Sequence, residues 1–335
     1  MAAKTQKILS ISVAAYNLGE MIDDCLKSFC DERFINDIEV LVVDDGSKDD
    51  TPQRVEKYVK KYPNSIKLIR QVNTGPGSTV NTGVSYATGK YFRMVDGDDW
   101  VNTEDFATLI EKLKTVDVDA VFANYTPYHN RRKQALDTCK INNMPVGEVF
   151  DFNTFEYDYS TPLRMHHTIY RTDIMKKHVK LDNGFYTDSE YMFYPTPYIK
   201  TCIYYDLNIY MYRTALAGQS TSPEKMRRNL GNHRLILDRH LAYYEKVKEK
   251  LHPNVRKYLA RQIAGYVVDH FDIVVLANEE DMTRQVKDLF KLVQREHPDI
   301  FDYLKNDKKY RITAGGNAIF VRLFWIYLTN RYKHI

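Results

Sequence analysis

Three carboxylates stand within four residues of this chain, at Asp96, Asp98 and Asp99. Like charges placed so closely repel one another, so each carboxylate is hard to ionise without a partner. A divalent cation removes that repulsion, and Mg²⁺ or Mn²⁺ characteristically bridges a few carboxylates to the phosphates of a substrate. The cluster therefore predicts a site for Mn²⁺ or Mg²⁺ with a phosphate-bearing ligand. An ordinary acidic turn is the alternative interpretation.

The acidic residues require a fold that brings them to one place. From residue 8 to about residue 124, short β-rich runs alternate with amphipathic stretches, which is typical of a mostly parallel sheet covered by helices. The expected strands are residues 8–14, 38–43, 66–71, 91–95 and 118–124. Ligands of such sheets lie beyond the carboxyl ends of the strands, where Asp45 and Asp96 stand. We therefore expect an α/β fold with its site at that edge.

Composition excludes several classes of protein. The net charge of +4 is the small difference between 48 basic and 44 acidic residues, far from the concentrated positive charge of a nucleic-acid-binding protein. The four cysteines have neither the spacing of a disulfide framework nor that of a zinc site. No run of about 18 apolar residues predicts a membrane span, and the N-terminus has no apolar signal core. We expect a cytoplasmic protein with no nucleic-acid partner.

The motifs around the acidic residues resemble those of the family 2 glycosyltransferases with the GT-A fold. The segments that carry the resemblance are Val13-Ala14-Ala15-Tyr16-Asn17, Val42-Val43-Asp44-Asp45-Gly46-Ser47, and the run from Tyr91 to Trp100. The resemblance is specific over about residues 8 to 110, looser to about residue 222, and absent beyond. It implies a Rossmann-like, mostly parallel sheet flanked by helices, and the helical pattern of the sequence from about Pro223 onward adds an α-helical C-terminal extension.

The same resemblance implies a division of the chain into three regions. Residues 1–100 correspond to the half of the GT-A domain that binds the nucleotide sugar, and residues 101–222 to the half that binds the acceptor. Beyond the resemblance, the helical pattern of the sequence itself predicts that residues 223–335 form a helical C-terminal region.

Several residues fall at positions that bind the nucleoside of the donor in the family. Ala14 and Tyr16 fall where the nucleotide base is held. Asp45 falls where a carboxylate accepts a hydrogen bond from the base N–H, which suits uracil. Asp96 falls nearest the ribose.

Further residues fall at the diphosphate end of the donor site. The resemblance places Asp98, together with Asp99, at the metal on the diphosphate, and it assigns Asn81 and Arg213 to donor binding. For Arg213 a salt bridge to a carboxylate is the alternative. Many members of the family have an Arg at the position of Val80, so another cation must replace it here.

A separate acidic segment supplies the candidate for the catalytic base. Many relatives carry Glu-Asp at the place of Thr187 and Asp188, and the Asp of that pair is the base. The spacing onward to Arg213 looks like that of the family and favours Asp188 over Glu190. An exposed acidic loop is the alternative interpretation.

A histidine pair, His166 and His167, precedes a strand-like run in the acceptor region. Contact with the acceptor and a structural role are both open for these rings. Because the spacing H-E-x-x-H is missing, the pair does not predict a zinc site.

Taken together, the residues and the resemblance imply an inverting glycosyltransferase. It would move a sugar from a nucleotide sugar, with a UDP-sugar favoured, to a hydroxyl of a carbohydrate or lipid-linked sugar acceptor. Cell-surface polysaccharide or glycoconjugate synthesis is the expected setting. The alternatives are a sugar-nucleotide nucleotidyltransferase and an inactive sugar- or nucleotide-binding protein of the same fold.

The end of the chain, residues 318–335, combines aromatic and basic side chains. Such a helix suits peripheral contact with the inner face of a cell membrane. Packing on the core of the protein itself, or on a second subunit in a homo-oligomer, is the alternative.

Overall fold

The computed structural model describes residues 6–159, 162–216, 222–277, 281–313 and 318–332. The chain divides into two compact units, residues 1–214 and residues 215–335. The boundary expected between residues 100 and 101 lies inside the first unit, within a strand. The boundary expected between residues 222 and 223 lies shortly after the end of that unit.

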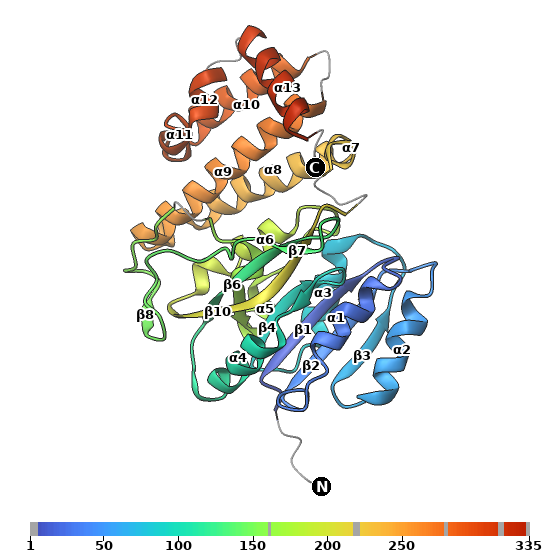
Figure 1. The fold of residues 1–335 in the computed structure, drawn as a ribbon. Coiled ribbons are helices and arrows are strands. Elements are labelled where there is room, and N and C mark those ends of the chain that lie inside the picture. Colours follow the sequence, from blue (N-terminus) through green and yellow to red (C-terminus); the bar gives the residue numbers. More distant parts are fainter. Residues whose placement is uncertain (1–5, 160–161, 217–221, 278–280, 314–317, 333–335) are drawn as a thin grey trace. The chain divides into compact units, whose positions relative to one another are not determined.

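The first unit is built on a ten-stranded mixed sheet in the described residues (Figure 1). Its order is β3-β2-β1-β4-β9-β6-β10-β5, with β7 beside β6 and β8 beside β10. The strands are β1 (Leu9–Ala15), β2 (Ile38–Asp44), β3 (Ile66–Arg70), β4 (Tyr91–Asp96), β5 (Trp100–Val101), β6 (Ala120–His129), β7 (Gln134–Ala135), β8 (Val149–Asp151), β9 (Thr168–Arg171) and β10 (Thr201–Thr214).

The strands of the first half run parallel, as the alternation of strands and helices predicts. β1 pairs in parallel with β2 and β4, and β2 with β3. β9 then lies antiparallel between β4 and β6. β1 and β2 are buried along nearly their whole length, so their apolar runs are continuous rather than alternating, as expected for strands covered on both faces.

Helices cover both faces of this sheet. In Figure 1, α1 (Met21–Ser28), α2 (Thr51–Lys61) and α4 (Thr103–Thr115) lie on the near side. The helices α3 (Pro76–Tyr86) and α5 (Thr172–His178) lie on the far side and contact each other. Shorter helical segments of this unit are η1 (Met165–His167), α6 (Asp188–Phe193) and η2 (Thr196–Tyr198). The apolar stripe of α4 fits this arrangement, because Phe106 packs edge-on against Phe29 and Phe34.

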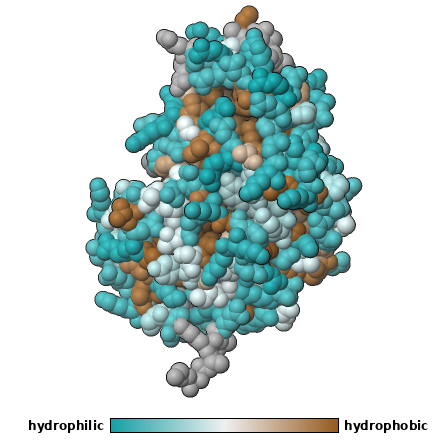
Figure 2. Space-filling view, turned by 180° about the vertical axis from the view of Figure 1, so that it is seen from behind, coloured by the Kyte–Doolittle hydropathy of each residue, from teal (hydrophilic) through white to brown (hydrophobic). Residues whose placement is uncertain are grey.

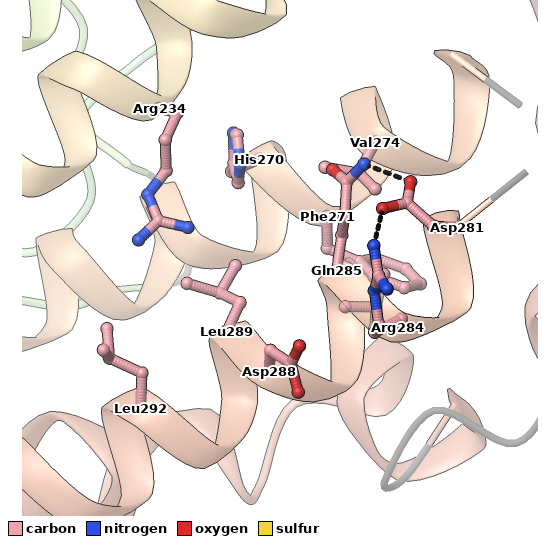
Figure 3. A pocket seen from close by; sticks show the side chains of 11 residues that line it. Arg234, His270, Phe271, Val274, Asp281, Arg284, Gln285, Asp288, Leu289 and Leu292 are labelled. Carbon is pink, nitrogen blue, oxygen red and sulfur yellow. Dashed lines mark hydrogen bonds and ion pairs between the residues drawn. The ribbon is translucent and has the colours of Figure 1, made fainter. Parts of the chain in front are cut away.

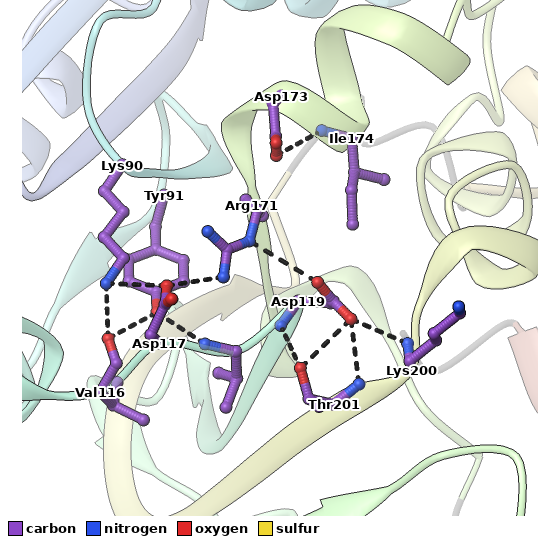
Figure 4. Close-up of polar contacts among 11 residues, drawn as sticks. Lys90, Tyr91, Val116, Asp117, Asp119, Arg171, Asp173, Ile174, Lys200 and Thr201 are labelled. Carbon is purple, nitrogen blue, oxygen red and sulfur yellow. Dashed lines mark hydrogen bonds and ion pairs between the residues drawn. The ribbon is translucent and has the colours of Figure 1, made fainter.

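A polar network fastens the strand ends on the side of the sheet away from the acidic clusters (Figure 4). Arg171, at the end of β9, pairs with Asp117 at 2.6 Å and with Asp119 at 3.6 Å. Asp117 also pairs with Lys90, just before β4, and Asp119 accepts from the backbone of Thr201 at the start of β10. Because β9 is antiparallel, its end meets the beginnings of its neighbours there. The network therefore joins four strands and holds their register.

The second unit is helical. It contains α7 (Pro223–Arg228), α8 (Leu230–Val247), η3 (Lys248–Lys250), α9 (Pro253–Ala277), α10 (Met282–Glu296), α11 (Pro298–Leu304), α12 (Lys308–Thr313) and α13 (Ala318–Tyr332). The long helix α9 contacts α7, α8, α10, α11 and α13. Its residues are buried on most sides, which is why its sequence is apolar almost all round.

A cavity of about 330 Å³ lies among α8, α9 and α10 (Figure 3). Two of the charged side chains that line it are paired with a residue close by in the sequence. Arg234 pairs with Asp238 at 2.9 Å, and Arg284 pairs with Asp281 at 2.6 Å. Both arginines that line the cavity therefore already have a partner on their own helix or its cap.

The face drawn in Figure 2 is mainly hydrophilic. Figure 2 shows hydrophilic and neutral side chains over most of the visible face, with hydrophobic ones in small groups. Within the described residues, no helix combines the length and the apolar character needed to cross a bilayer.

Candidate active site

The carboxyl ends of β1, β2 and β4 bring three of the expected donor-site residues together. Ala14 stands in register with Val43 on one side and with Asp96 on the other. Just after β2, the backbone N–H of Asp45 donates to the backbone oxygen of Ala15 at 2.8 Å. Tyr16, directly after β1, is 46% exposed, so its ring is available to a ligand.

Asp45 is buried and already accepts several hydrogen bonds. Its Oδ1 accepts from the Gln71 amide at 2.8 Å and from the Thr74 N–H at 3.0 Å, and its Oδ2 accepts from the Gly75 N–H at 2.9 Å. These bonds fix the carboxylate against the loop that opens α3. Oδ2 accepts one of these bonds and can accept one more. A hydrogen bond from the base N–H to Oδ2 therefore stays a prediction that this geometry permits.

The turn between the acidic residues after β4 requires glycine. A Cβ atom on Gly97 would lie 2.4 Å from Leu18 Cδ1 and 2.6 Å from the Ala14 oxygen, and Gly97 donates its own N–H to that oxygen at 3.0 Å. Only a residue without a side chain lets β4 turn this close to β1. The turn therefore fixes where Asp96 and Asp98 project.

Asp99 is buried and held from β10. Its Oδ2 accepts from the Tyr210 hydroxyl at 2.7 Å and its Oδ1 from the Arg213 N–H at 2.6 Å. The guanidinium of Arg213 donates to the Asp98 backbone oxygen at 2.6 Å and pairs with Asp24 at 2.9 Å. The salt bridge considered as the alternative for Arg213 is thus present, and contact with the donor stays a prediction.

The acidic cluster is electrostatically strained. Burial, together with the charges of Asp98 and Asp188, raises the pKa of Asp96 to about 8. Burial likewise raises the pKa of Asp98 and of Asp99 above the usual range. Carboxylates in this state are stabilised by a nearby cation. The ligand atoms of Asp96, Asp99 and His166 lie within 4.8 Å of one another, so the residues present fit a divalent cation.

Asp188 begins α6 and is exposed to solvent at that turn. Protein atoms nevertheless crowd its carboxyl group, and this desolvation raises its pKa above the usual range. Glu190 is different because it is fully buried, accepting from the Asp182 N–H and from the Tyr194 hydroxyl, each at 2.6 Å. Of the two acidic residues, Asp188 is therefore the one that can meet a substrate. Tyr186, two residues earlier, has a φ of 67°, a strained conformation of the kind found at functional sites.

Asn81 ties α3 to the loop that precedes Asp188. Its amide donates to the Leu181 oxygen at 2.9 Å and accepts from the Leu181 N–H at 3.0 Å. A Cβ atom on Gly77 would lie 1.8 Å from the Asp182 oxygen, so helix and loop touch backbone to backbone. The structure thus places Asn81 in a bridging position, apart from the acidic cluster, and its contact with a donor stays a prediction.

Several residues of the site carry no local sequence signal. Tyr210 contacts both Asp99 and the Asp96 N–H, and Asn130 accepts from Arg213 at 3.1 Å. Asp24, on α1, is linked to the site through Arg213. Each lies far along the chain from its partner, so only the folded sheet brings them together.

The fold and the site define a mostly parallel α/β domain with a carboxylate cluster at the carboxyl ends of its strands. Residues 10–178, half of the chain, match the family model described as Glycosyl transferase family 2. The chain therefore belongs to glycosyl transferase family 2, which confirms the resemblance seen in the motifs.

Among curated relatives, the chain is similar to the uncharacterized glycosyltransferase EpsJ of Bacillus subtilis (strain 168). The two are 33% identical over 126 residues, which cover 38% of this chain and 36% of the relative. The chain thus spans about a third of the length of that relative.

Solved structures share the fold. The structure of S. aureus TarS 1–349 in complex with UDP-GlcNAc is 18% identical, with a TM-score of 0.61 over 98% of this chain and 92% of that one. The mannosyltransferase PcManGT from Pyrobaculum calidifontis, in complex with GDP-Man and Mn²⁺, is 14% identical, with a TM-score of 0.50 over 98% and 88%. At this identity the likeness concerns the fold, and it confirms the expected GT-A arrangement with C-terminal helices.

Proposed function

We propose that this protein is an inverting glycosyltransferase that moves a sugar from a UDP-sugar to a hydroxyl group of a carbohydrate or lipid-linked sugar acceptor. Membership of glycosyl transferase family 2 supports the class of reaction. The TarS complex with UDP-GlcNAc supports a nucleotide sugar as the donor. Cell-surface polysaccharide or glycoconjugate synthesis is the setting that this chemistry suits.

The proposal rests mainly on the pairing of Asp188 with the acidic cluster. Asp188 is exposed and lies close enough to Asp96 for its charge to raise the pKa of Asp96. One solvent-accessible carboxylate with a raised pKa thus stands beside a group of carboxylates that attracts a cation. This is the arrangement that transfer by a single displacement requires, because it needs one base and a site for the leaving diphosphate.

Asp188 and Asp98 have separate roles in the proposed reaction. Asp188 accepts the proton of the acceptor hydroxyl as its oxygen attacks the anomeric carbon, and attack from the face opposite the diphosphate inverts that carbon. When bound, the cation supplies positive charge to the departing diphosphate. Asp98, at the turn after β4, would hold that cation together with Asp99, as the family resemblance implies. No separate acid is needed to protonate the leaving group, unlike in glycoside hydrolysis.

The proposed nucleotide preference follows from two residues beyond the ends of β1 and β2. Asp45 offers a carboxylate to the uracil N–H, and the exposed ring of Tyr16 offers a surface to the base. We expect UDP to bind more tightly than GDP in a competition titration with Mn²⁺ present. Equal affinities would leave the choice of nucleotide open and would remove the role given to Asp45.

A screen of nucleotide sugars with Mn²⁺ tests the function directly. A donor present at one hundred times its dissociation constant stabilises the folded protein by ~2.7 kcal/mol, which a thermal shift detects. Transfer, or slow hydrolysis of the bound donor, then establishes activity. Binding without any turnover would favour an inactive binding protein. Release of pyrophosphate from UTP and a sugar phosphate would favour a nucleotidyltransferase.

The role of the cation is tested by calorimetry of UDP binding with and without a chelator. UDP binding should require Mn²⁺ or Mg²⁺, and Asp98→Ala should abolish it. Tight binding that survives metal removal would contradict the assignment of Asp98. A matched substitution, Asp151→Ala in the short strand β8, should leave UDP binding unchanged.

A further inference from the structure

A groove of about 780 Å³ lies between α3 and α5, the two helices on the far side of the sheet in Figure 1. The residues that line it come from α3 and the loop before it, and from the end of α5 and the loop after it. All of them belong to the first unit. The groove is as large as many pockets that bind small molecules in proteins. No residue of the acidic cluster lines it, so the groove is a separate feature.

The wall formed by α5 and the loop after it is basic. Lys176 and Lys177 lie in the last turn of α5, and Lys180 follows two residues after its end. None of the residues that line the groove is Asp or Glu. Lys176 and Lys177 are exposed, and in the described part of the chain neither of them is in an ion pair. Uncompensated charges of one sign in a concave surface attract ligands of the opposite sign.

The opposite wall, made of α3 and the loop before it, presents hydroxyl oxygens. Thr82 donates its O–H to the Gln71 side chain at 2.7 Å. Ser85 donates to the Thr82 backbone oxygen, and Thr74 to the Val72 oxygen, each at 2.7 Å. A hydroxyl has one O–H to donate, so these three side chains offer a ligand their oxygens as acceptors. This wall therefore suits the O–H groups of a sugar or a polyol.

The lining residues do not suit other anionic ligands equally well. None of them is Phe, Tyr or Trp, the side chains on which the bases of single-stranded nucleic acids stack. His178 is aromatic, but its ring already stacks on Tyr198 with centroids 3.5 Å apart. The apolar lining residues are three valines, which offer little surface to a lipid chain. Cations on one wall and acceptor oxygens on the other match a chain that carries both anionic groups and hydroxyls.

One end of the groove lies on the loop that leads to the proposed base. Asn183 lines the groove, and its backbone oxygen accepts from the Gly77 N–H at 3.2 Å. Asp188 follows five residues later. Because an extended chain spans at most about 3.6 Å per residue, the backbone of Asp188 lies within about 18 Å of Asn183. A chain of several units held in the groove is therefore long enough to bring a hydroxyl to Asp188.

We propose that this groove is a subsite for the acceptor, and that the acceptor is a chain of sugar or polyol units that carry phosphate or carboxylate groups. The proposal rests on the function proposed above, because it names the substrate class of the same reaction. Lys176 and Lys177 bind the anionic groups as point charges, which phosphate and carboxylate accept alike. The hydroxyl oxygens of α3 accept from the O–H groups of the units. The groove thus holds a part of the acceptor that does not react.

Binding is tested by fluorescence anisotropy with the full chain and labelled oligomers of equal length, without nucleotide. The anionic probes are an oligomer of glycerol phosphate and an oligomer of galacturonic acid. At least one of them should bind, more weakly as salt rises, and the tighter one identifies the anionic group. The double variant Lys176→Gln with Lys177→Gln should weaken that binding about fivefold, the scale of two exposed ion pairs. A neutral maltodextrin and oligothymidylate should bind more weakly and lose little.

A matched pair of lysines controls for net charge. Lys60→Gln with Lys61→Gln removes the same charge from the last turn of α2, on the other face of the sheet, and should leave oligomer binding unchanged. Thermal unfolding verifies that both double variants are folded. Lysines near the end of a helix also stabilise its C-terminus. A lower melting temperature with unchanged oligomer affinity in the α5 variant would show this structural role alone and would overturn the proposal.

Kinetics then test whether the bound oligomer is an acceptor. With the tighter anionic oligomer and a UDP-sugar, the α5 variant should raise KM for the oligomer about fivefold and leave kcat nearly unchanged. Such a change means that the lysines bind the acceptor equally in the ground state and the transition state. The affinity for UDP should stay the same, because neither lysine lies at the proposed donor site.

The outcomes separate this proposal from the proposed function. Equal losses in the two double variants, or equal binding of maltodextrin or oligothymidylate, would overturn it. Binding to anionic vesicles that depends on Lys176 and Lys177, without binding to either anionic oligomer, would assign the surface to a membrane instead. If sugar is transferred to a neutral acceptor while neither anionic oligomer binds, the function stands without the groove. Lysine-dependent oligomer binding without turnover of any nucleotide sugar keeps the groove and loses the function.

Discussion

The Nε of Arg213 donates to the backbone oxygen of Asp98 at 2.6 Å, across 115 residues of chain. The guanidinium also lies over the Trp100 ring, 4.6 Å from its centroid, and pairs with Asp24. One side chain of β10 thus braces the turn that carries the acidic cluster. The shape of that turn depends on a residue from the far end of the domain.

Arg213→Lys should loosen this brace, because lysine lacks the planar fork that reaches several partners at once. We expect a loss of unfolding free energy on the order of 2 kcal/mol. Affinity for UDP with Mn²⁺ should fall by about tenfold. Urea unfolding and calorimetry measure the two effects.

Asp24→Asn is the control and should lower the unfolding free energy by less than about 1 kcal/mol, since Asp24 is exposed. Equal costs for both variants would mean that the ion pair, and not the bond to Asp98, matters.

Asp188→Asn should leave UDP and Mn²⁺ binding nearly unchanged but lower the transfer rate at least ~10²-fold, the usual scale for a lost general base. Asparagine keeps the size and the hydrogen bonding of the side chain but accepts no proton at neutral pH. Calorimetry measures binding, and a coupled assay of UDP release measures transfer. Ser189→Ala, on the same turn, should retain most of the activity.

Glu190→Gln should behave differently from Asp188→Asn. Because Glu190 is buried and accepts from Asp182 and Tyr194, its substitution should lower the melting temperature while the remaining folded protein still turns over. An inactive but stable Glu190→Gln protein beside an active Asp188→Asn protein would show that the base has been assigned to the wrong residue.

The second unit should lose stability in mild acid. Burial lowers the pKa of His270 to about 4, of His240 to about 3 and of His233 to about 2, all from 6.5. The folded state keeps these rings neutral, whereas the unfolded chain takes up protons below pH 6.5. Stability is therefore complete above about pH 6.5 and falls toward pH 4, by about 1.4 kcal/mol per pH unit for each histidine.

The two tryptophans of the chain make this measurable. In a Trp100→Phe background, the fluorescence of Trp325 follows unfolding of the second unit by urea at pH 7, 6 and 5. His240→Phe keeps a ring beside Tyr266. It should lower the slope of unfolding free energy against pH by about 1.4 kcal/mol per pH unit, the contribution of one histidine. An unchanged slope would mean that His240 is protonated in the folded protein.

The exposed face of α13 should determine any contact with a membrane. Ile319, Leu323 and Ile326 are 70%, 56% and 46% exposed, whereas Val321 and Leu328 are buried. Leu323→Glu with Ile326→Glu should lower co-sedimentation with anionic vesicles at low salt and leave UDP affinity intact. Point substitutions are preferable to deletion of residues 318–335, because Phe324 stacks on Phe271 of α9. If the unaltered chain ignores vesicles and its mass in solution falls on substitution, the face is a subunit contact.

Local patterns in the sequence were sufficient for the first half of the fold. The expected strands at residues 38–43 and 91–95 match β2 and β4 to within one residue, because in both a mainly apolar run ends at an acidic turn. The place of β9 was not predictable in this way. The strand-like run after the histidine pair corresponds to β9, but pairing between segments so far apart leaves no periodic signal that would set it between β4 and β6.

The same limit applies to the site. The close spacing of three carboxylates in the sequence is enough to make Asp96, Asp98 and Asp99 candidate site residues. His166 has no such signal, because it comes close to Asp96 and Asp99 only in the folded domain, and the sequence leaves the histidine pair between acceptor contact and a structural role. Asp24 is likewise 189 residues from Arg213, and nothing near it predicts the contact.

The paired hydrogen bonds between Asn81 and Leu181 limit how the catalytic loop can move. Asn81 of α3 bonds both the backbone oxygen and the backbone N–H of Leu181. Two residues later, the Asn183 oxygen accepts from the Gly77 N–H. The Gly184 oxygen also accepts from the Gly77 N–H, so the chain is anchored up to four residues before Asp188 and only the short stretch around Tyr186, with its left-handed backbone, is left to adjust. For the proposed base, this fixed anchor means that the length of that stretch limits how bulky an acceptor can approach Asp188.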